Sequence, residues 1–479
     1  MEPAAEATNA KRPFRGPMTV ALRSNTRSVF ALPALLPAAL TLAGCTASTS
    51  EFVLPPGYGD GLAGRAFKIG TTNHTLADLQ TEELRLTFDV AARTTLGHAE
   101  VHFRPVETGE PFFLLTPTAR TARLDGRPVT LAKLRDPDDV ITLTTIGVEL
   151  TADSDHVLEI DYPLATTGAP GSGYSTTGVD FETAMVDLAG ATSATGDGAP
   201  ANFLEAYAPA SIEADQFQLA VELELVGATA PHRLFSNGDQ RAVGPRRWTI
   251  EFPAYFSTSS FYFRLTEWPF VVREATYHGL ARDIPITAYA LDGAAADQAI
   301  GYLPGYFADL EASFGAYDHP SFVAAITDDL GPSMEYAGAT RTSIANLSHE
   351  LCHSWFGRGV LPADGRSGWI AEAIAFWRDR KYQATPDHGP RAPANLARLS
   401  IWQPATVANA DFDGSAVLSE LDARLADRGG LRPILRTFYA QWNERPITTE
   451  QFLRFVETQS GLSLDSYVQE YVYGEPPAR

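Results

Sequence analysis

Residues 348–377 read SHELCHSWFGRGVLPADGRSGWIAEAIAFW, and this stretch carries the clearest chemical pattern in the sequence. It opens with His349 and Glu350, and His353 follows four positions after the first histidine. Because positions i and i+4 of a helix lie one above the other, both imidazoles can reach a single metal ion. Glu350 is then close enough to handle the proton of a metal-bound water. The stretch therefore predicts a metal site with hydrolytic chemistry.

A third metal ligand is predicted farther along the same stretch. Glu372 follows His353 after 18 intervening residues, in an otherwise apolar helical run at residues 369–377. A carboxylate in such a run is costly to bury unless it is paired or bound to a metal. Two histidines and one glutamate, with the fourth position left for water, form the catalytic rather than the structural zinc pattern. The sequence therefore predicts one Zn2+ ion held by His349, His353 and Glu372.

The composition limits the classes of partner. The chain has 479 residues, 44% of them hydrophobic, which is enough for two or three domains with proper cores. Its 37 basic and 58 acidic residues give a net charge of −21, which repels phosphates and argues against a nucleic-acid partner. The sequence does not specify an oligomeric state.

The N-terminal segment predicts export. An apolar stretch at residues 29–42 is too short for a comfortable membrane span, and Leu-Ala-Gly-Cys at its end resembles a bacterial lipobox ending in Cys45. We expect residues 1–44 to be a lipoprotein signal peptide, with Met18 as an alternative start, and residues 45–65 to be a tether. An ordinary signal peptide with a coincidental cysteine is the alternative. The prediction is an exported bacterial lipoprotein, anchored to a membrane and facing the periplasm or cell exterior.

The cysteines fit this prediction. Cys45 and Cys352 are the two cysteines of the chain. If Cys45 carries a lipid, no intramolecular disulfide can form, even in an oxidising compartment. Cys352 lies inside the metal motif but on another helix face, so a small buried packing residue is favoured over a ligand or nucleophile.

The first half of the chain is predicted to be rich in strands. Alternation of apolar and polar residues marks strands at residues 84–90, 99–103, 157–162, 217–225, 248–252 and 261–265. Residues 164–201 are low in complexity and predict a long loop. His98 and His102 repeat the i, i+4 spacing, but in a strand they lie about 13 Å apart and cannot share a metal. We therefore expect a β-rich domain over residues 66–268.

The second half changes to a mixed pattern after a predicted joint near Trp268. Strands are expected at residues 284–290 and 321–327, and helices at residues 294–314, 415–426, 431–442, 449–460 and 463–473. The helix with the metal motif is expected to start at about Ile344. Thr449 and Ser463 lie where helix caps are expected. Residues 269–479 are thus predicted to form the catalytic domain of an α+β protein.

Three motifs together resemble the gluzincin zinc aminopeptidases, the family of membrane alanyl aminopeptidases and leukotriene hydrolases. Residues 353–357 are similar to H-x-W-F-G, and residues 369–373 to W-L-N-E-G with alanine in place of Asn and Gly. Residues 333–336 resemble G-x-M-E-N in an M-E-Y variant. The resemblance covers most of residues 66–479, with its specific part at residues 331–377. It implies a saddle-like β domain followed by a thermolysin-like α/β zinc peptidase domain that ends in helices.

The resemblance implies a role for each site residue. His349, His353 and Glu372 would bind zinc, and Glu350 would be the general base and later protonate the leaving amine. Glu335 would hold the free α-ammonium of a peptide substrate, which restricts cleavage to the N-terminal residue. An unrelated loop carboxylate is the alternative reading of Glu335.

One catalytic group of the family has no clear match. The family stabilises the oxyanion with a tyrosine in a Y-x-K-G-like segment, and the best match, residues 411–414, places Asp411 at the tyrosine position with Phe412 beside it. Loss of one such donor typically costs about 10²–10³ in rate. Either another group, such as Tyr382 or Tyr439, replaces it, or the site is impaired.

The sequence therefore leaves three functions open. The first is a membrane-anchored zinc aminopeptidase that acts on peptides, and the second is a catalytically impaired homologue that binds zinc and peptides. The third is a zinc endopeptidase, against which Glu335 argues because a carboxylate across the cleft suits a free amine. The family's second amine-binding residue has no clear match; Glu205 is a weak candidate, and a structural role is favoured for it.

Overall fold

The computed structural model describes residues 65–164, 178–181, 185–188, 204–327, 333–382, 394–403 and 406–475. The predicted signal peptide, Cys45 and the tether up to residue 64 lie outside these ranges. The described residues belong to one compact unit. Within them, every helix is too short or too polar to serve as a membrane span.

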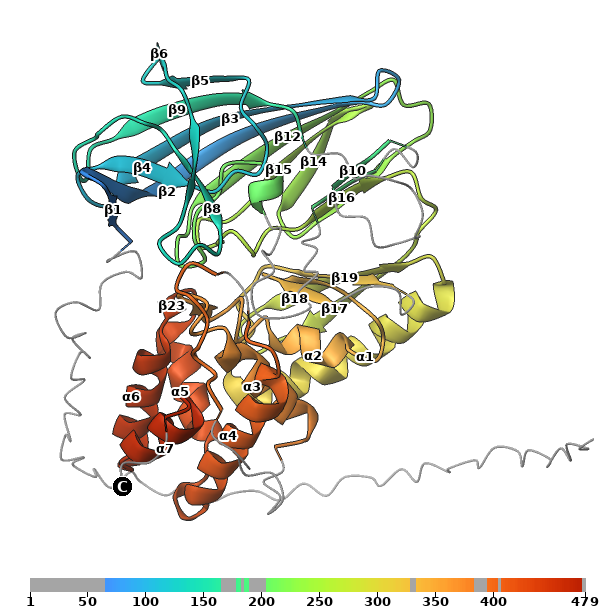
Figure 1. Cartoon of the computed structure of the whole chain (residues 1–479). Coiled ribbons are helices and arrows are strands. Elements are labelled where there is room, and N and C mark those ends of the chain that lie inside the picture. Colours follow the sequence, from blue (N-terminus) through green and yellow to red (C-terminus); the bar gives the residue numbers. More distant parts are fainter. Residues whose placement is uncertain are drawn as a thin grey trace, which may run out of the picture. The chain divides into compact units, whose positions relative to one another are not determined.

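A large sheet of twelve strands forms most of the N-terminal half (Figure 1). Its strands are β1 (Phe67–Ile69), β2 (Thr72–Asp89), β3 (Thr94–Pro105), β4 (Glu110–Phe113), β5 (Thr121–Leu124), β6 (Arg127–Pro128), β7 (Ala132–Arg135), β8 (Thr142–Thr145), β9 (His156–Tyr162), β12 (Gln218–Val226), β14 (Asp239–Gly244) and β15 (Arg247–Glu251). The main path runs β14-β15-β12-β2-β3-β9-β5-β6. Leu84, Leu86 and Phe88 of β2 are buried while Arg85 is exposed, which is the alternation that predicted the strand.

A smaller four-stranded sheet corrects one prediction. Its order is β10 (Gly178–Asp180), β11 (Met185–Leu188), β16 (Phe263–Thr266) and β13 (Arg233–Ser236). Both β10 and β11 lie inside residues 164–201, which were expected to be a long loop. Strands of three and four residues are too short to show alternation within a segment of low complexity.

A five-stranded sheet supports the candidate site. Its order is β17 (Val271–His278), β18 (Asp283–Ala290), β19 (Phe322–Ile326), β21 (Ala339–Thr342) and β20 (Met334–Tyr336). Phe322, Ala324 and Ile326 of β19 pack in the same cluster as α1 (Gly293–Phe314), whereas Val323 and Ala325 pack in the cluster that contains Phe235 and Tyr262 of the β-rich half. Because both faces are covered, β19 is apolar throughout, which explains its continuous hydrophobic run.

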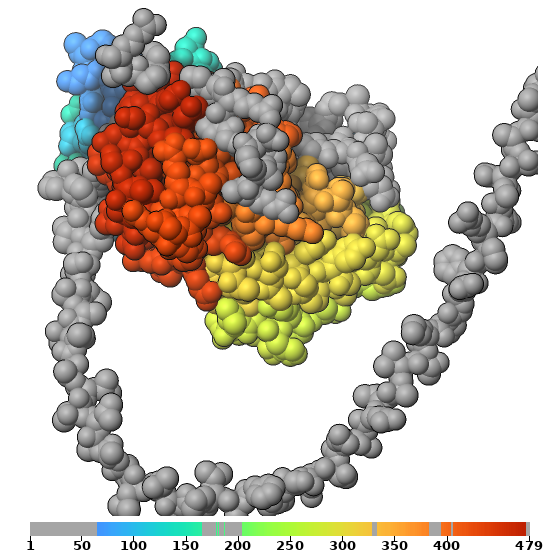
Figure 2. All heavy atoms as spheres, turned by 90° about the horizontal axis from the view of Figure 1, so that it is seen from below, coloured from blue at the N-terminus to red at the C-terminus, as the bar shows by residue number. Residues whose placement is uncertain are grey.

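The rest of the chain is mainly helical. The elements are η1 (Leu204–Ala206), α2 (Leu347–Cys352), β22 (Leu361–Pro362), α3 (Trp369–Asp379), α4 (Ala410–Arg424), η2 (Ala426–Arg428), α5 (Arg432–Trp442), β23 (Pro446–Ile447), α6 (Thr449–Ser460) and α7 (Asp465–Tyr471). The helix α1 contacts α2 and α5, and in Figure 2 its yellow surface adjoins the orange-to-red surface of the C-terminal helices.

The predicted starts of α4 and α7 and two predicted helix caps are wrong, whereas α6 spans Thr449–Ser460 as predicted. The helix α4 begins at Ala410, five residues before the predicted residue 415. The cap of α6 is Thr448, whose side chain and that of Gln451 form a reciprocal capping box, so Thr449 is already helical. The helix α7 begins at Asp465 and has no side-chain cap, so Ser463 does not cap it.

Glu82 of β2 is a buried carboxyl group in the core of the large sheet. Neither of its carboxyl oxygens has a hydrogen-bond partner among the described residues. Burial raises the pKa of Glu82 well above its ordinary value of 4.5. The folded chain therefore keeps this carboxyl protonated at a pH where the unfolded chain ionises it. The free energy of unfolding must then fall as the pH rises above about 4.5.

The substitution Glu82→Gln is expected to stabilise the fold at pH 8, because an amide of the same shape has no charge to bury. The expected gain is about 1–3 kcal/mol at pH 8 and should shrink toward pH 4. Urea unfolding followed by tryptophan fluorescence at both pH values measures it. The exposed neighbour Glu83→Gln is the matched control and should change little. A Glu82→Gln variant that is equally destabilised at both pH values would contradict the expectation.

Candidate active site

The two histidines of the motif lie one above the other at the end of α2. The helix begins at Leu347, three residues later than expected, and ends at Cys352, so His353 lies just beyond it. His353 keeps helical dihedral angles, with φ −62 and ψ −18, and the i, i+4 stacking therefore continues through it. The two imidazole rings have their centroids 4.9 Å apart.

Glu372 on α3 completes a set of three metal donors. Its Oε2 atom lies 3.3 Å from Nε2 of His349 and 3.7 Å from Nε2 of His353. All three donor atoms fall within 4.8 Å of one another. Two ligands bound tetrahedrally to zinc at 2.0–2.1 Å are about 3.4 Å apart. The donor types and their spacing therefore fit a zinc ion.

Both imidazoles are oriented by a hydrogen bond at their other nitrogen. Nδ1 of His349 lies 2.8 Å from Oδ2 of Asp379, and Nδ1 of His353 lies 3.1 Å from the carbonyl oxygen of Phe356. Donation at Nδ1 leaves the lone pair of Nε2 directed at the metal position. Asp379 was not predicted, although it follows Glu372 by seven residues on α3. Seven residues are two helical turns, so the spacing places both carboxylates on one face.

The charges around these donors favour a bound cation. Burial disfavours the charged imidazole of His349, but hydrogen bonds to Asp379 and Glu372 outweigh it and raise its pKa to about 11. Burial likewise opposes ionisation of Glu372, but His353, His349 and Arg358 outweigh it and lower its pKa to about 2. Both shifts show that the carboxylates around these donors favour a positive charge, which a metal ion would supply.

Glu350 lies beside the donor set and is buried. Burial raises its pKa well above the ordinary value, and the nearby carboxylate of Glu335 raises it further. Ligand atoms of Glu335, Glu350 and His353 all lie within 4.8 Å of one another. A buried carboxylate with a raised pKa next to a metal position is suited to accept and return a proton.

Glu335 reaches the site from the edge of the five-stranded sheet. It lies on β20, a three-residue edge strand that returns to β21 through a tight turn at Gly338, whose φ is +67. Its carboxylate is ion-paired at 3.1 Å with Nη2 of Arg358, the residue that follows the H-x-W-F-G motif. The structure thus brings Glu335, Glu350 and the three metal donors together.

A second carboxylate, Glu213, was missed by the sequence analysis. Its Oε1 lies 3.0 Å from Nη1 of Arg358, while Glu205 lies in η1 and its carbonyl oxygen accepts a hydrogen bond from Thr116. Glu213, which was not a candidate, therefore joins the carboxylate group. Ser257 and Ser259 donate hydroxyl hydrogen bonds to Glu213. The serine-rich run at residues 257–260 was the one signal in the sequence for this contact, because these hydroxyl groups are the hydrogen-bond donors to Glu213.

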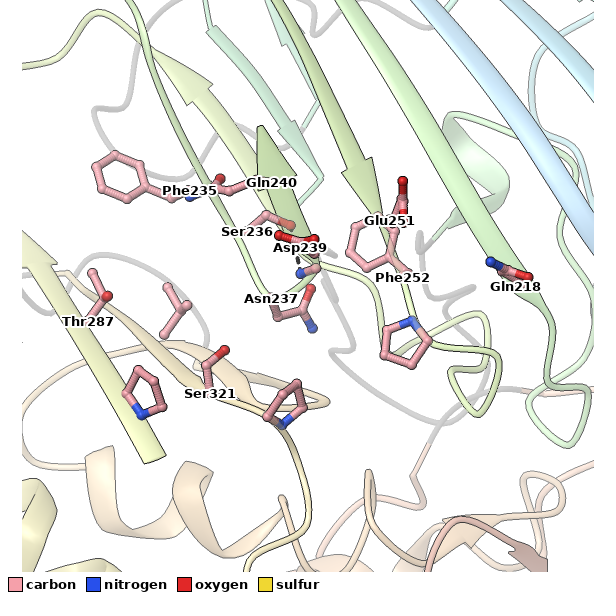
Figure 3. Close-up of a pocket in the computed structure, with 15 residues that line it drawn as sticks. Gln218, Phe235, Ser236, Asn237, Asp239, Gln240, Glu251, Phe252, Thr287 and Ser321 are labelled. Atoms are coloured by element: carbon pink, nitrogen blue, oxygen red, sulfur yellow. Dashed lines mark hydrogen bonds between the residues drawn. The ribbon is translucent and has the colours of Figure 1, made fainter. Parts of the chain in front are cut away.

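These residues share a small cavity. It has a volume of about 40 Å³, and its lining includes Glu213, Glu335, Arg358, Ala371 and Glu372. A larger cavity of about 610 Å³ lies elsewhere. Its lining includes Ser236, Asn237, Asp239, Thr287 and Ser321, as Figure 3 shows, and contains none of the metal donors.

The place expected for the family's tyrosine holds no tyrosine. Asp411 and Phe412 lie in the first turn of α4, where the Phe412 ring packs 4.7 Å from that of Phe376. Gly414 of the same segment touches α3, since a Cβ atom there would lie 2.7 Å from that of Ala373. The glycine of this segment is thus required for helix packing.

The two alternative tyrosines differ in their surroundings, because the hydroxyl of Tyr382 is hydrogen-bonded whereas that of Tyr439 is buried without a hydrogen-bond partner among the described residues. The hydroxyl of Tyr382 donates a hydrogen bond to Ser313 of α1. Tyr439 is buried on α5 and packs against Phe356, and burial raises its pKa well above the ordinary value. Cys352 is fully buried in the hydrophobic core of this half, as predicted for a packing residue.

The substitution Asp379→Asn is expected to weaken zinc binding by about 10–100-fold, because it removes the charge that orients His349 and favours its donor tautomer. Competition with a chromogenic chelator measures the affinity. Asp283→Asn is a matched control, since Asp283 makes the same 2.8 Å contact with an exposed histidine, His278. Equal zinc affinities for the wild type and Asp379→Asn would show that Asp379 has no such role.

Comparison with solved structures identifies the fold. The M1 zinc metallopeptidase from Deinococcus radiodurans aligns with a TM-score of 0.63 and 18% identity over 85% of this chain and 96% of that one. Legionella pneumophila aminopeptidase A aligns with a TM-score of 0.62 and 14% identity, over 84% of this chain and 50% of that one. Yeast LTA4 hydrolase aligns with a TM-score of 0.59 and 12% identity, over 84% of this chain and 69% of that one. No protein-family model and no curated protein matches. The likeness confirms the predicted α+β fold, that of M1 zinc metallopeptidases.

Proposed function

We propose that the protein is a zinc-dependent aminopeptidase that removes the N-terminal residue of peptides. The observation that carries this proposal is the meeting of two groups of residues. One is the donor set of His349, His353 and Glu372, and the other is the carboxylate pair of Glu213 and Glu335. Similar proteins support it, because a mutant of the Deinococcus radiodurans metallopeptidase has been solved with a Tyr-Ser-Ala substrate, and a mutant two-domain M1 zinc metallopeptidase with L-arginine.

The roles of the chain's own residues follow from their chemistry. His349, His353 and Glu372 hold the zinc ion, which when bound acts as a Lewis acid toward the substrate carbonyl and water. Glu350 accepts the proton of the attacking water on a carboxylate oxygen and passes it to the leaving amine. Its raised pKa suits the acceptance of the proton, since the conjugate base of a weaker acid is the stronger base.

The carboxylates at the small cavity support the restriction to free N-termini. Glu335 is accessible enough to pair with an α-ammonium, with 16% of its side chain exposed. A cavity of about 40 Å³ has room for only a few atoms, so it favours a chain end over a continuing peptide. This favours an aminopeptidase over an endopeptidase.

A second candidate function is a zinc-binding homologue that binds peptide ends without turnover. The sequence supports this candidate, because Asp411 falls at the predicted tyrosine position and a carboxylate there would oppose a developing oxyanion. The retention of Glu350 beside the metal donors favours catalysis.

We also propose that the protein is exported and held at a membrane by a lipid on Cys45. The sequence of residues 1–44 and the composition of residues 45–65 support this proposal. Peptides outside the cytoplasm would then be its substrates.

Digestion of paired peptides tests the proposed function. The zinc-loaded full chain is incubated with tripeptides that carry either a free or an acetylated N-terminus, and the products are identified by mass spectrometry. We expect residues to be released one at a time from the free peptide and the acetylated peptide to stay intact. Equal cleavage of both would contradict the assignment of Glu335. Binding of one zinc without any cleavage would favour the second candidate.

A further inference from the structure

Arg358 is a buried arginine whose donors are directed at the carboxylate pair. Only 6% of its side chain is exposed. Nη1 lies 3.0 Å from Glu213 and also donates to Ser259, and Nη2 lies 3.1 Å from Oε1 of Glu335. Nε donates to the carbonyl oxygen of Glu335 at 3.4 Å. The guanidinium of Arg358 thus binds both the side chain and the backbone of Glu335.

The three side chains together carry one net negative charge, since two carboxylates face one guanidinium. The contacts of the two carboxylates with Arg358, at 3.0 and 3.1 Å, are within hydrogen-bond distance. The guanidinium is planar and permanently charged, so it can bridge two carboxylates without losing its proton. One negative charge remains for a ligand.

Of the two carboxylates, that of Glu335 is the more accessible to a ligand. Its side chain is 16% exposed, whereas that of Glu213 is 5% exposed. Glu213 is also held by Ser257 and Ser259. A ligand that enters the cavity therefore meets the carboxylate of Glu335 before that of Glu213.

We infer that Arg358 is a positioning residue that fixes the selectivity of this site for a single free α-ammonium. It neutralises Glu213 and holds Glu335 in place, so that one carboxylate accepts one ammonium group. This inference rests on the proposed function and extends it to a residue outside the metal set.

The inference makes a charge-specific prediction. Arg358→Gln leaves the buried Glu213 and the partly exposed Glu335 without this counter-ion, so Glu335 is no longer held in the geometry that accepts an ammonium. Addition of Glu213→Gln removes the surplus charge, and the neutral pair can then bridge by amide hydrogen bonds. A purely structural role of Arg358 would give no such rescue.

Peptide binding tests this without turnover. Every variant is the zinc-loaded full chain that also carries Glu350→Gln, and calorimetry gives Kd for Ala-Ala-Ala and for its N-acetyl form. We expect Arg358→Gln to lower the preference for the free peptide by at least about tenfold, and the double variant with Glu213→Gln to regain most of it. Arg282→Gln removes an exposed ion-paired arginine and is the control.

The outcomes separate the inference from the proposed function. If the protein that carries Glu350→Gln alone (the parent) binds both peptides equally, the proposed amine site itself is refuted. A folded Arg358→Gln variant that keeps the parent's preference, or a double variant as unselective as Arg358→Gln alone, would overturn the inference. If Arg358→Gln does not fold, Arg358→Lys takes its place. A lysine keeps the charge but cannot bridge both carboxylates, so we expect it to lower the preference by about threefold or more, and an unchanged preference would again overturn the inference.

Discussion

Replacement of Glu350 by glutamine is expected to lower kcat by about 10²–10⁴-fold with little change in zinc content, because the amide cannot accept a proton. Glu350 is buried, and its carboxylate lies within 4.8 Å of ligand atoms of both His353 and Glu335. The amide has the size of the carboxylate, so the packing of α2 should survive. Peptide turnover and zinc content, measured on one preparation, test this prediction.

Glu274→Gln on the exposed strand β17 is the matched control and should leave kcat unchanged. If Glu350→Gln kept more than about a tenth of wild-type kcat, proton transfer by Glu350 would be refuted. If it lost zinc as well, Glu350 would instead stabilise the metal site.

Replacement of both His349 and His353 by alanine is expected to abolish zinc binding, because a single carboxylate, Glu372, remains of the donor set. Zinc content after dialysis should fall from about one ion per chain to below about a tenth. Activity should fall with it.

The chain offers an unusually close control for this double variant. His98 and His102 have the same i, i+4 spacing but lie on strand β3, paired with Asp161 and Glu100. Alanine at both positions should leave zinc content unchanged. Loss of zinc from the His98 and His102 double variant, or retention of zinc by the His349 and His353 double variant, would show that the metal lies elsewhere.

The fold was predictable where the sequence shows a clear period. Residues 84–90 alternate because one face of β2 is buried, and β19 is apolar because both faces are buried. The donor set was predictable because the i, i+4 spacing survives at the end of α2. Each of these features is a local property that a single segment displays.

The residues that were missed depend on contacts between distant segments. Glu213 joins Glu335 only through Arg358, which lies 145 residues farther along the chain than Glu213. The short strands β10 and β11 form because β16 is beside β11. Gly414 of α4 approaches α3 closely, a contact that no pattern within α4 reveals.

Titration of the metal-free full chain with zinc, while release of the N-terminal residue from a free tripeptide is followed, tests the central claim most directly. We expect release to be absent without metal, to rise in proportion to added zinc and to level off at one ion per chain. Release by the metal-free chain, or none at any amount of zinc, would contradict a zinc-dependent aminopeptidase.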